Sequence, residues 1–284
     1  MKLSELLDGI EALRGVSDRE IGNVTNDSRK VEKGDLFVCI TGAASDGHDY
    51  AAAALQKGAA AVVCERDLGL ENQVLVADTH GAYGKIAANF YGNPSKKLKL
   101  IGVTGTKGKT TVTSLIKAIL TRTGQKVGLI GTIQNEIGDE VLHTENTTPD
   151  AMELERLYRK MVEAGCEYCV MEVSSHALDQ ERIGDSHYEV AVFTNLSHEH
   201  LDYHKDMESY FAAKKKLFSR CDKAVVNVDD AYGRRIAADC TCPVMTFSLE
   251  EEADLRAFQL TCHPDSVDFR FGYEGVESRL HFAM

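Results

Sequence analysis

Basic residues are scarce in this sequence of 284 residues. The 32 Lys and Arg stand against 44 Asp and Glu, which gives a formal net charge of -12 and a pI near 5.3. A protein that binds nucleic acid regardless of sequence needs an excess of Lys and Arg to displace counterions. The composition therefore argues against nucleic acid as a partner and favours small ligands.

Long hydrophobic runs are also missing. Residues 1–8 mix Glu and Asp with apolar side chains and contain no continuous apolar core and no cleavage-like site, so we expect no secretory signal. No other stretch approaches the length of a membrane span, and there is no internal repeat or low-complexity segment. With 43% hydrophobic and 27% charged residues, the composition is that of a soluble globular protein long enough for two domains.

Cysteine pairs at the spacing of a zinc site are lacking. The eight cysteines are spread along the chain, which favours a reducing cytoplasm over an oxidising compartment. Cys166 and Cys169 have C-x-x-C spacing but fall in a predicted buried strand, and Cys240 and Cys242 are only two residues apart. We therefore expect no metal or redox role for them.

A glycine-rich segment is present at residues 102–111, Gly-Val-Thr-Gly-Thr-Lys-Gly-Lys-Thr-Thr, between an apolar run and a stretch with helical periodicity. Glycines let the backbone turn so that successive N–H groups and the following helix N-terminus face the phosphates of a ligand. Lys109 would neutralise phosphate charge, and Thr110 would offer its hydroxyl to the Mg²⁺ that accompanies ATP. The segment predicts a site for a nucleoside triphosphate.

The spacing departs from the strict phosphate-loop pattern G-x-x-x-x-G-K-[ST], which places a glycine where Val103 stands. Glycines occupy positions 102, 105 and 108 instead, so the loop is a variant. The alternative is a glycine-rich turn between a strand and a helix that binds nothing. The Gly-Lys-Thr-Thr at its end favours the phosphate site.

The pattern of residues predicts an α/β protein of two domains. Residues 1–95 form the first, and turn residues at 93–96 precede a fresh strand at the boundary. The elements expected in it are helices at 3–13, 50–57 and 81–91 and strands at 35–40, 60–64 and 73–77.

Residues 96–284 alternate between strands and helices, which predicts a mostly parallel sheet with helices on both faces. Strands are expected at 98–103, 126–130, 168–173, 189–194 and 224–228, and helices at 111–122, 150–163 and 207–218. The alternating pattern of residues 257–284 predicts antiparallel strands. Ligands of such sheets gather outside the carboxyl ends of the parallel strands.

Polar clusters follow two of these strands. Glu172 closes one strand, where a carboxylate would lie near the phosphate loop and could bind Mg²⁺. His200 and Asp202 follow the next strand. Each histidine taken alone is more simply a surface or capping residue, and the common position at one sheet edge is what indicates function.

Two further features have a structural explanation. Asp150 is suited to cap the helix that starts there, which explains this residue fully. The run Lys214-Lys215-Lys216 is typical of a solvated helix face. The alanines before it and the Leu-Phe pair after it indicate instead that one lysine points inward.

These residues resemble those of the Mur ligases, the ATP-dependent acid–amino-acid ligases of peptidoglycan precursor synthesis, and among them the members that add the third amino acid. The similarity spans nearly the whole chain and two of the family's three domains. The motifs that carry it lie at residues 26–29, 34–37, 46–48, 104–111, 146–149, 171–176, 195–204 and 210–214.

The resemblance implies a UDP-substrate-binding first domain and a central domain that holds ATP, Mg²⁺ and the muramoyl dipeptide. The implied ATP contacts are Gly105, Thr106, Lys107, Gly108, Lys109, Thr110 and Thr111. The implied contacts to the UDP-sugar-peptide are Asn26, Ser28, Ala43, Ala44, Ser45, Asn146, Thr147, Thr148, Ser174, Gln180 and Arg182. The implied metal ligands are Thr110, Glu172, His200 and Lys214, the lysine as a carbamate.

The catalytic residues that the resemblance implies are Lys109, Lys214 and His200. Carbamylation of Lys214 would turn a cation into an anionic oxygen ligand that helps to hold a second Mg²⁺. The glutamyl carboxylate of UDP-MurNAc-L-Ala-D-Glu would attack the γ-phosphate of ATP, and an amine would displace phosphate from the resulting acyl phosphate. Positioning and electrostatics would supply the catalysis, with no protein nucleophile.

The incoming amino acid that we expect is meso-diaminopimelate rather than lysine, and the expected form is a cytoplasmic monomer with no membrane partner. In this family a third domain binds the amino acid and closes over ATP, and we expect it to be absent from this sequence. Three alternatives stay open: a Mur-type ligase or its two-domain fragment, a folylpolyglutamate-synthetase-like ligase, and a non-catalytic UDP-sugar and ATP binding module. The segment 27–29 argues against the second.

Overall fold

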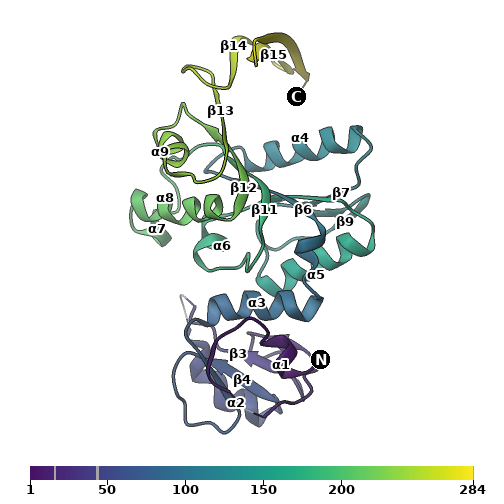
Figure 1. Ribbon diagram of the computed structural model, residues 1–284, viewed down its shortest axis with the longest axis vertical. Helices are drawn as coiled ribbons and strands as arrows, with labels where there is room; N and C mark the ends of the chain where they lie inside the picture. Colours follow the sequence, from purple (N-terminus) through teal and green to yellow (C-terminus); the bar gives the residue numbers. More distant parts are fainter. Residues whose placement is uncertain (16, 43–44, 284) are drawn as a thin grey trace. The chain divides into compact units, whose positions relative to one another are not determined.

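The computed structural model describes residues 1–15, 17–42 and 45–283, and the chain divides into two compact units. Unit 1 comprises Met1–Leu98, Pro149–Gly165 and Gln180–Ser186. Unit 2 comprises Lys99–Thr148, Cys166–Asp179 and His187–Met284. Both units combine helices with a mostly parallel sheet, which confirms the predicted α/β class (Figure 1).

Unit 1 is built on a sheet of order β1-β5-β4-β3-β2, parallel except for β1. Its strands are β1 (Ala12–Arg14), β2 (Val24–Thr25), β3 (Leu36–Val38), β4 (Ala61–Cys64) and β5 (Gln73–Val76). Its helices are α1 (Leu3–Leu6), η1 (Gly47–Tyr50), α2 (Ala51–Gln56), α3 (Thr79–Tyr91), η2 (Pro94–Lys97) and α5 (Ala151–Glu163).

Helix α5 packs on α3 within unit 1 although residues 92–150 separate the two in the chain. Ala151 is buried in the same apolar cluster as Leu3, Leu6 and Ile86. Asp150 caps α5 by accepting a hydrogen bond from the Glu153 N–H at 3.0 Å, as the sequence predicts. The predicted boundary at residue 96 puts this helix in the second domain, whereas its contacts group it with unit 1.

The predicted opening helix at residues 3–13 is wrong beyond its first turn. Helix α1 ends at Leu6, and Gly9 adopts a left-handed φ of 74° that stops helical continuation. Leu13 lies in β1 opposite β5 and is 64% exposed, so it takes no part in a buried helical face. The leucine spacing reflects two short elements rather than one helix.

Unit 2 forms an eleven-stranded sheet in its described part, of order β16-β15-β14-β13-β12-β11-β6-β10-β7-β8-β9. The central strands are parallel: β6 (Lys99–Thr104), β7 (Val127–Ile130), β10 (Tyr168–Glu172), β11 (Tyr188–Phe193), β12 (Cys221–Asn227) and β13 (Val244–Ser248). The outer strands are antiparallel hairpins: β8 (Asn135–Ile137) with β9 (Glu140–Leu142), and β14 (Leu255–Cys262) with β15 (Ser266–Tyr273) and β16 (Val276–Ala283). The antiparallel strands predicted near the end of the sequence are confirmed.

The helices of unit 2 are α4 (Lys109–Arg122), α6 (Ser175–Asp179), α7 (Leu201–His204), α8 (Met207–Lys215), η3 (Lys216–Ser219) and α9 (Ala231–Asp239). Figure 1 shows α4 on one side of the central strands and α6 on the other. Helix α4 packs through Ile116 and Leu120 on the buried residues Ile101, Val127 and Val170. Helix α4 therefore lies against the central strands and is joined to the end of β6 by residues 105–108.

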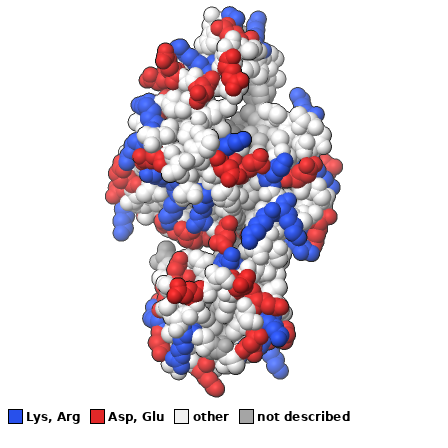
Figure 2. All heavy atoms as spheres, viewed as in Figure 1, with Lys and Arg blue, Asp and Glu red and all other residues white. Residues whose placement is uncertain are grey.

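The described residues contain no helix long and apolar enough to cross a membrane. Figure 2 shows acidic and basic side chains interspersed over the visible face, in keeping with a chain that carries more acids than bases.

Candidate active site

The glycine-rich loop joins the carboxyl end of β6 to the first turn of α4. Gly105 has a φ of 150°, and a Cβ there would lie 1.9 Å from the Thr194 hydroxyl, so only glycine fits. Gly108 precedes α4 in the left-handed conformation with a φ of 85°. Helix α4 begins at Lys109, two residues before the predicted start. The loop is thus a strand-to-helix turn with the helix N-terminus open to an anion.

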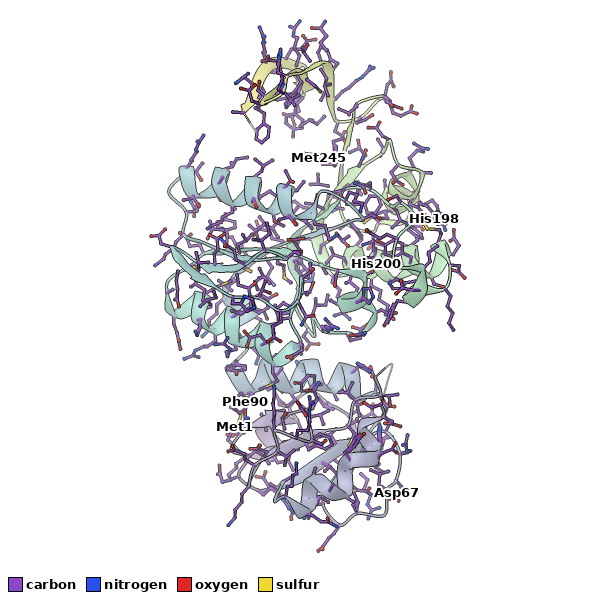
Figure 3. All side chains as sticks on the ribbon, turned by 180° about the vertical axis from the view of Figure 1, so that it is seen from behind. Met1, Asp67, Phe90, His198, His200 and Met245 are labelled. Atoms are coloured by element: carbon purple, nitrogen blue, oxygen red, sulfur yellow. The ribbon has the colours of Figure 1, made fainter. Side chains whose placement is uncertain are left out.

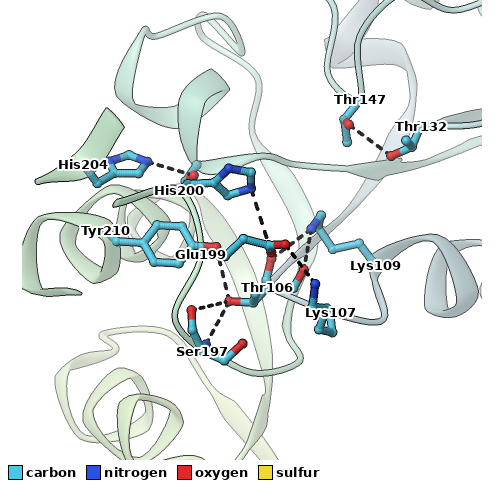
Figure 4. Close-up of polar contacts among 12 residues, drawn as sticks. Thr106, Lys107, Lys109, Thr132, Thr147, Ser197, Glu199, His200, His204 and Tyr210 are labelled. Atoms are coloured by element: carbon cyan, nitrogen blue, oxygen red, sulfur yellow. Dashed lines mark hydrogen bonds and ion pairs between the residues drawn. The ribbon is translucent and has the colours of Figure 1, made fainter. Parts of the chain in front are cut away.

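Two lysines from different helices contact this loop, and Figure 4 labels one of them, Lys109. The Lys109 ammonium donates to the carbonyl oxygens of Gly105 and Thr106, both at 3.0 Å. The Lys214 ammonium, from α8, donates to the same Gly105 oxygen at 2.8 Å. Lys214 is 1% exposed, which confirms that one lysine of the run points inward.

Burial lowers the pKa of both lysines. Desolvation is the main cause for Lys214, whose pKa falls well below its usual value, and the charge of Lys109 adds to it. Desolvation also lowers the pKa of Lys109, against an opposing attraction from Glu172. Lys214 is therefore a buried amine biased toward its neutral form.

Glu172 ends β10 beside the first turn of α4 and is buried. Its carboxylate accepts hydrogen bonds from the Thr110 hydroxyl at 3.0 Å and from the Thr132 N–H at 2.8 Å. A Cβ on Gly131 would lie 2.7 Å from this carboxylate, so a side chain there would displace the Glu172 carboxylate from its present position. The structure brings together the carboxylate and hydroxyl that the sequence assigned to Mg²⁺.

The segment after β11 packs against the loop from the other side. Asn195 accepts the Lys107 N–H at 3.0 Å and donates to the Lys107 carbonyl at 3.0 Å. Glu199 forms an ion pair with Lys107 at 2.8 Å. These loop contacts of Asn195 were missed by sequence reasoning, although its position just beyond the carboxyl end of β11 was a usable signal.

His200 immediately precedes α7, and Figure 3 labels it on the segment that leads into that helix. Its Nε2 lies 3.9 Å from Glu199, and its ring makes edge contacts with His176 and Tyr210. Its side chain is 44% exposed, so it is available to a ligand. Asp202, in α7, is exposed.

The residues implied for the muramoyl dipeptide fall in both units. In unit 2, the Thr148 hydroxyl donates to the Glu172 carbonyl at 2.9 Å and accepts from the Ser174 N–H at 3.0 Å. Thr147 lies 3.0 Å from Thr132, next to the same strand end, and Asn146 accepts a hydrogen bond from Thr144 through its carbonyl. In unit 1, Arg182 donates to the Gln180 side chain.

A cavity of about 510 Å³ in unit 1 is lined by the residues implied for the uridine nucleotide. Asn26, Ser28 and Ser45 contribute to its wall, together with Asp27 and Arg29. The guanidinium of Arg29 lowers the pKa of Asp27 to about 2 through a direct hydrogen bond. Ala43 and Ala44 lie outside the described residues.

The cysteines show one arrangement that the sequence did not predict. The Cys221 and Cys240 sulfurs each lie 3.6 Å from that of Cys242. In the described ranges, no group of three or more His, Cys, Asp or Glu is arranged to hold a metal ion.

Two family models cover most of the chain. Residues 103–283 match the Mur ligase middle domain, and residues 20–91 match the Mur ligase family, catalytic domain. The chain belongs to the Mur ligase family. Residues 103–111 of the glycine-rich loop, Glu172, His200 and Lys214 of this Mur ligase lie within the middle-domain match.

Two curated relatives are named for the same ligase activity. A UDP-N-acetylmuramoyl-L-alanyl-D-glutamate--2,6-diaminopimelate ligase of Clostridium perfringens (strain 13 / Type A) is 42% identical over 98% of the chain and 59% of the relative. The corresponding ligase of Listeria monocytogenes serotype 4b (strain F2365) is 43% identical over 95% of the chain and 58% of the relative. The chain thus spans somewhat under two thirds of the length of these relatives.

Solved structures agree with the family. A UDP-N-acetylmuramoyl-L-alanyl-D-glutamate--2,6-diaminopimelate ligase matches with a TM-score of 0.80 and 30% identity, over 92% of this Mur ligase and 55% of that chain. A folylpolyglutamate synthase complex (FPGS-AMPPCP) matches with a TM-score of 0.54 and 17% identity over 69% of the chain and 56% of that chain, a likeness of fold alone.

Proposed function

We propose that this chain carries the substrate- and ATP-binding parts of an ATP-dependent amide ligase that adds meso-diaminopimelate to UDP-MurNAc-L-Ala-D-Glu. The observation that carries the proposal is the meeting of Lys109 and buried Lys214 on one loop carbonyl, beside Thr110 and Glu172. The names of the relatives support the choice of substrate. On this proposal, unit 1 residues 1–95 bind the uridine nucleotide and residues 96–284 bind ATP.

The nucleotide site uses residues 105–111. The α4 N-terminus and the loop N–H groups would face the phosphates, because Gly105 and Gly108 leave no side chain in the way. The Lys109 ammonium donates to the carbonyl oxygens of Gly105 and Thr106. When nucleotide binds, it would donate to phosphate oxygens instead. The nucleotide would thereby replace weak neutral acceptors with charged ones.

The residues present fit Mg²⁺ together with a carbamate. Thr110 and Glu172 supply oxygen atoms at the end of β10. His200 is exposed and follows β11, which lies on the opposite side of β6 from β10. Lys214 is a buried amine with a lowered pKa, and only the neutral amine reacts with CO₂ to form a carbamate. Mg²⁺ would offset negative charge on the phosphoryl group during transfer.

The remaining implied residues would bind the other substrate. Asn26, Ser28 and Ser45 would contact the uridine nucleotide in the unit 1 cavity. The peptide would contact Asn146, Thr147, Thr148, Ser174, Gln180 and Arg182. Its glutamyl carboxylate attacks the γ-phosphate of ATP to give an acyl phosphate and ADP, and the amine of the amino acid then displaces phosphate. The protein's part is to orient these groups and to balance their charge.

We also propose a monomer in a reducing cytoplasm. All eight cysteines are unpaired, including Cys221 and Cys242 whose sulfurs are in contact, and a disulfide-forming compartment would favour their oxidation.

Calorimetric titration and an ADP-release assay test the proposal together. We expect UDP-MurNAc-L-Ala-D-Glu and ATP each to bind, and ADP to be released when meso-diaminopimelate is added. Uptake of the UDP compound without ADP release would identify a binding module. Failure to bind the UDP compound, with ATP bound, would favour a ligase of the folylpolyglutamate type.

A further inference from the structure

Helix α8 contacts the phosphate loop at a second point, four residues before Lys214. We propose that Tyr210 is a positioning residue for nucleotide binding, acting through the hydroxyl of Thr106. The inference rests on the proposed ATP site and assigns a role to a motif residue that the proposed reaction leaves unused. Tyr210 and Lys214 are spaced i, i+4, so they lie on the same face of α8.

The Tyr210 ring is held in one orientation. The side chain is fully buried, and the His204 ring lies against it at a centroid distance of 5.1 Å. His204 is itself fixed by a contact of 2.9 Å between its Nε2 and the Ser175 hydroxyl. The Lys214 ammonium lies 4.7 Å from the centroid of the Tyr210 ring. These contacts leave the phenol oxygen aimed at the loop, 3.2 Å from the Thr106 hydroxyl (Figure 4).

Thr106 links this phenol to the rest of the loop. Its hydroxyl accepts the Ser197 N–H at 2.9 Å, and its own N–H donates to the Asn195 carbonyl at 2.8 Å. Its carbonyl accepts from Lys109 at 3.0 Å. Thr106 therefore connects the Tyr210 phenol, through its side chain, to a peptide unit whose carbonyl accepts a hydrogen bond from Lys109.

The Tyr210 phenol matters because the other contact between α8 and the loop, the hydrogen bond from Lys214 to Gly105, would be lost if Lys214 were carbamylated. Lys214 holds Gly105 through its ammonium group, and conversion of that group to a carbamate would remove the cation. Tyr210 does not form a carbamate, so its hydrogen bond to Thr106 would hold the loop in the same conformation whether or not Lys214 is carbamylated. Loss of the phenol should lower the fraction of loops that can bind phosphate, and the apparent affinity falls by that fraction.

A double-mutant cycle on the 284-residue chain tests the inference. A non-hydrolysable ATP analogue with Mg²⁺ is titrated calorimetrically into the parent, Tyr210→Phe, Thr106→Val and the double variant. We expect Tyr210→Phe to weaken binding about three- to tenfold, the loss of one hydrogen bond. The double variant should bind no more weakly than Thr106→Val, because both changes remove the same contact. Thr106→Ser, which keeps the hydroxyl, should bind within about twofold of the parent.

Tyr203→Phe is the matched control, since Tyr203 belongs to the same aromatic cluster but donates to Asp179 at 2.9 Å. Tyr203→Phe should bind the nucleotide analogue as tightly as the parent, and its effect should simply add to that of Thr106→Val. Unfolding midpoints measured without nucleotide show whether a variant binds weakly because it is less stable. Thr106→Val removes the same contact from the loop side, so it tests the inference even if a Tyr210 variant is unstable. Parent-like affinity of Tyr210→Phe, or additive losses in the double variant, would overturn the inference. If Lys109→Ala also left affinity unchanged, the ATP site itself would be wrong.

Discussion

Lys109 and Lys214 donate hydrogen bonds to the same acceptor, the carbonyl oxygen of Gly105, at 3.0 and 2.8 Å. Two ammonium groups that share a neutral oxygen repel each other, and burial removes the water that would screen them. An anion at the loop, or neutralisation of Lys214, relieves this repulsion. The arrangement therefore favours the binding of phosphate and the uncharged form of the buried lysine.

Lys109→Ala should abolish measurable ATP binding. The loop would lose its nearest cation, and charged hydrogen bonds of about 1.5–3 kcal/mol each predict a loss of about 100-fold or more when two are removed. Calorimetry with Mg²⁺ and ATP checks this. Arg122→Ala is the control, because Arg122 is an exposed cation at the far end of the same helix. An unchanged affinity for Lys109→Ala contradicts the loop assignment.

Lys214 should form a carbamate that can be seen by NMR. In ¹³C-bicarbonate buffer we expect a carbamate resonance from the parent and from Lys215→Ala, whose lysine pairs with Asp239 at the surface, but none from Lys214→Ala. A lysine is neutral above its pKa, and burial lowers the pKa of Lys214, so the signal should appear at a lower pH than for an exposed lysine. A resonance that persists in Lys214→Ala would assign the carbamate elsewhere.

The sequence predicts the parts of the site that follow from strand ends. Glu172 is the last residue of one apolar strand and His200 follows the next, and the apolar neighbours of Lys214 indicate that one lysine of its run is buried. Contacts such as that between Thr106 and Tyr210 join residues 104 positions apart, and local pattern carries no signal for them. The same holds for α5, whose periodicity predicts a helix but not its packing on α3. The spacing of Leu13 from the preceding leucines predicted a helix that is not there, because this spacing does not show that Gly9 adopts a left-handed backbone conformation.

Glu172→Gln should weaken the Mg²⁺ dependence of nucleotide binding. The amide keeps an oxygen that can accept from Thr110 or Thr132, so the fold should survive while the anionic ligand is lost. We expect the gain in affinity on adding Mg²⁺ to fall about tenfold, or about 1.4 kcal/mol. Glu136→Gln is the control, because Glu136 lies in β8 and forms an ion pair with Lys117 of α4. A full Mg²⁺ effect in Glu172→Gln means that Glu172 does not bind the metal.

Glu155 should make unit 1 less stable as the pH rises. This α5 side chain is 2% exposed, and in the described part of the chain its Oε2 has no hydrogen-bond partner. Burial raises its pKa to about 8, and the charge of Asp185 adds to the shift. The folded state therefore binds a proton that the unfolded state has released, and this stabilisation is present below about pH 4.5 and lost as the pH rises to about 8.

Glu155→Gln tests this by removing the titration while keeping the shape of the side chain. Glu155→Gln should therefore be more stable relative to the parent at pH 8 than at pH 5: the difference in unfolding free energy, variant minus parent, should rise by on the order of 3 kcal/mol between the two pH values. Denaturant unfolding at the two pH values measures the difference. Glu153→Gln serves as the control, because Glu153 lies on the same helix, 40% exposed, in an ion pair with Arg156. If the parent and Glu155→Gln lose stability in parallel between pH 5 and pH 8, another group is responsible for the pH dependence, because a glutamine cannot take up or release the proton.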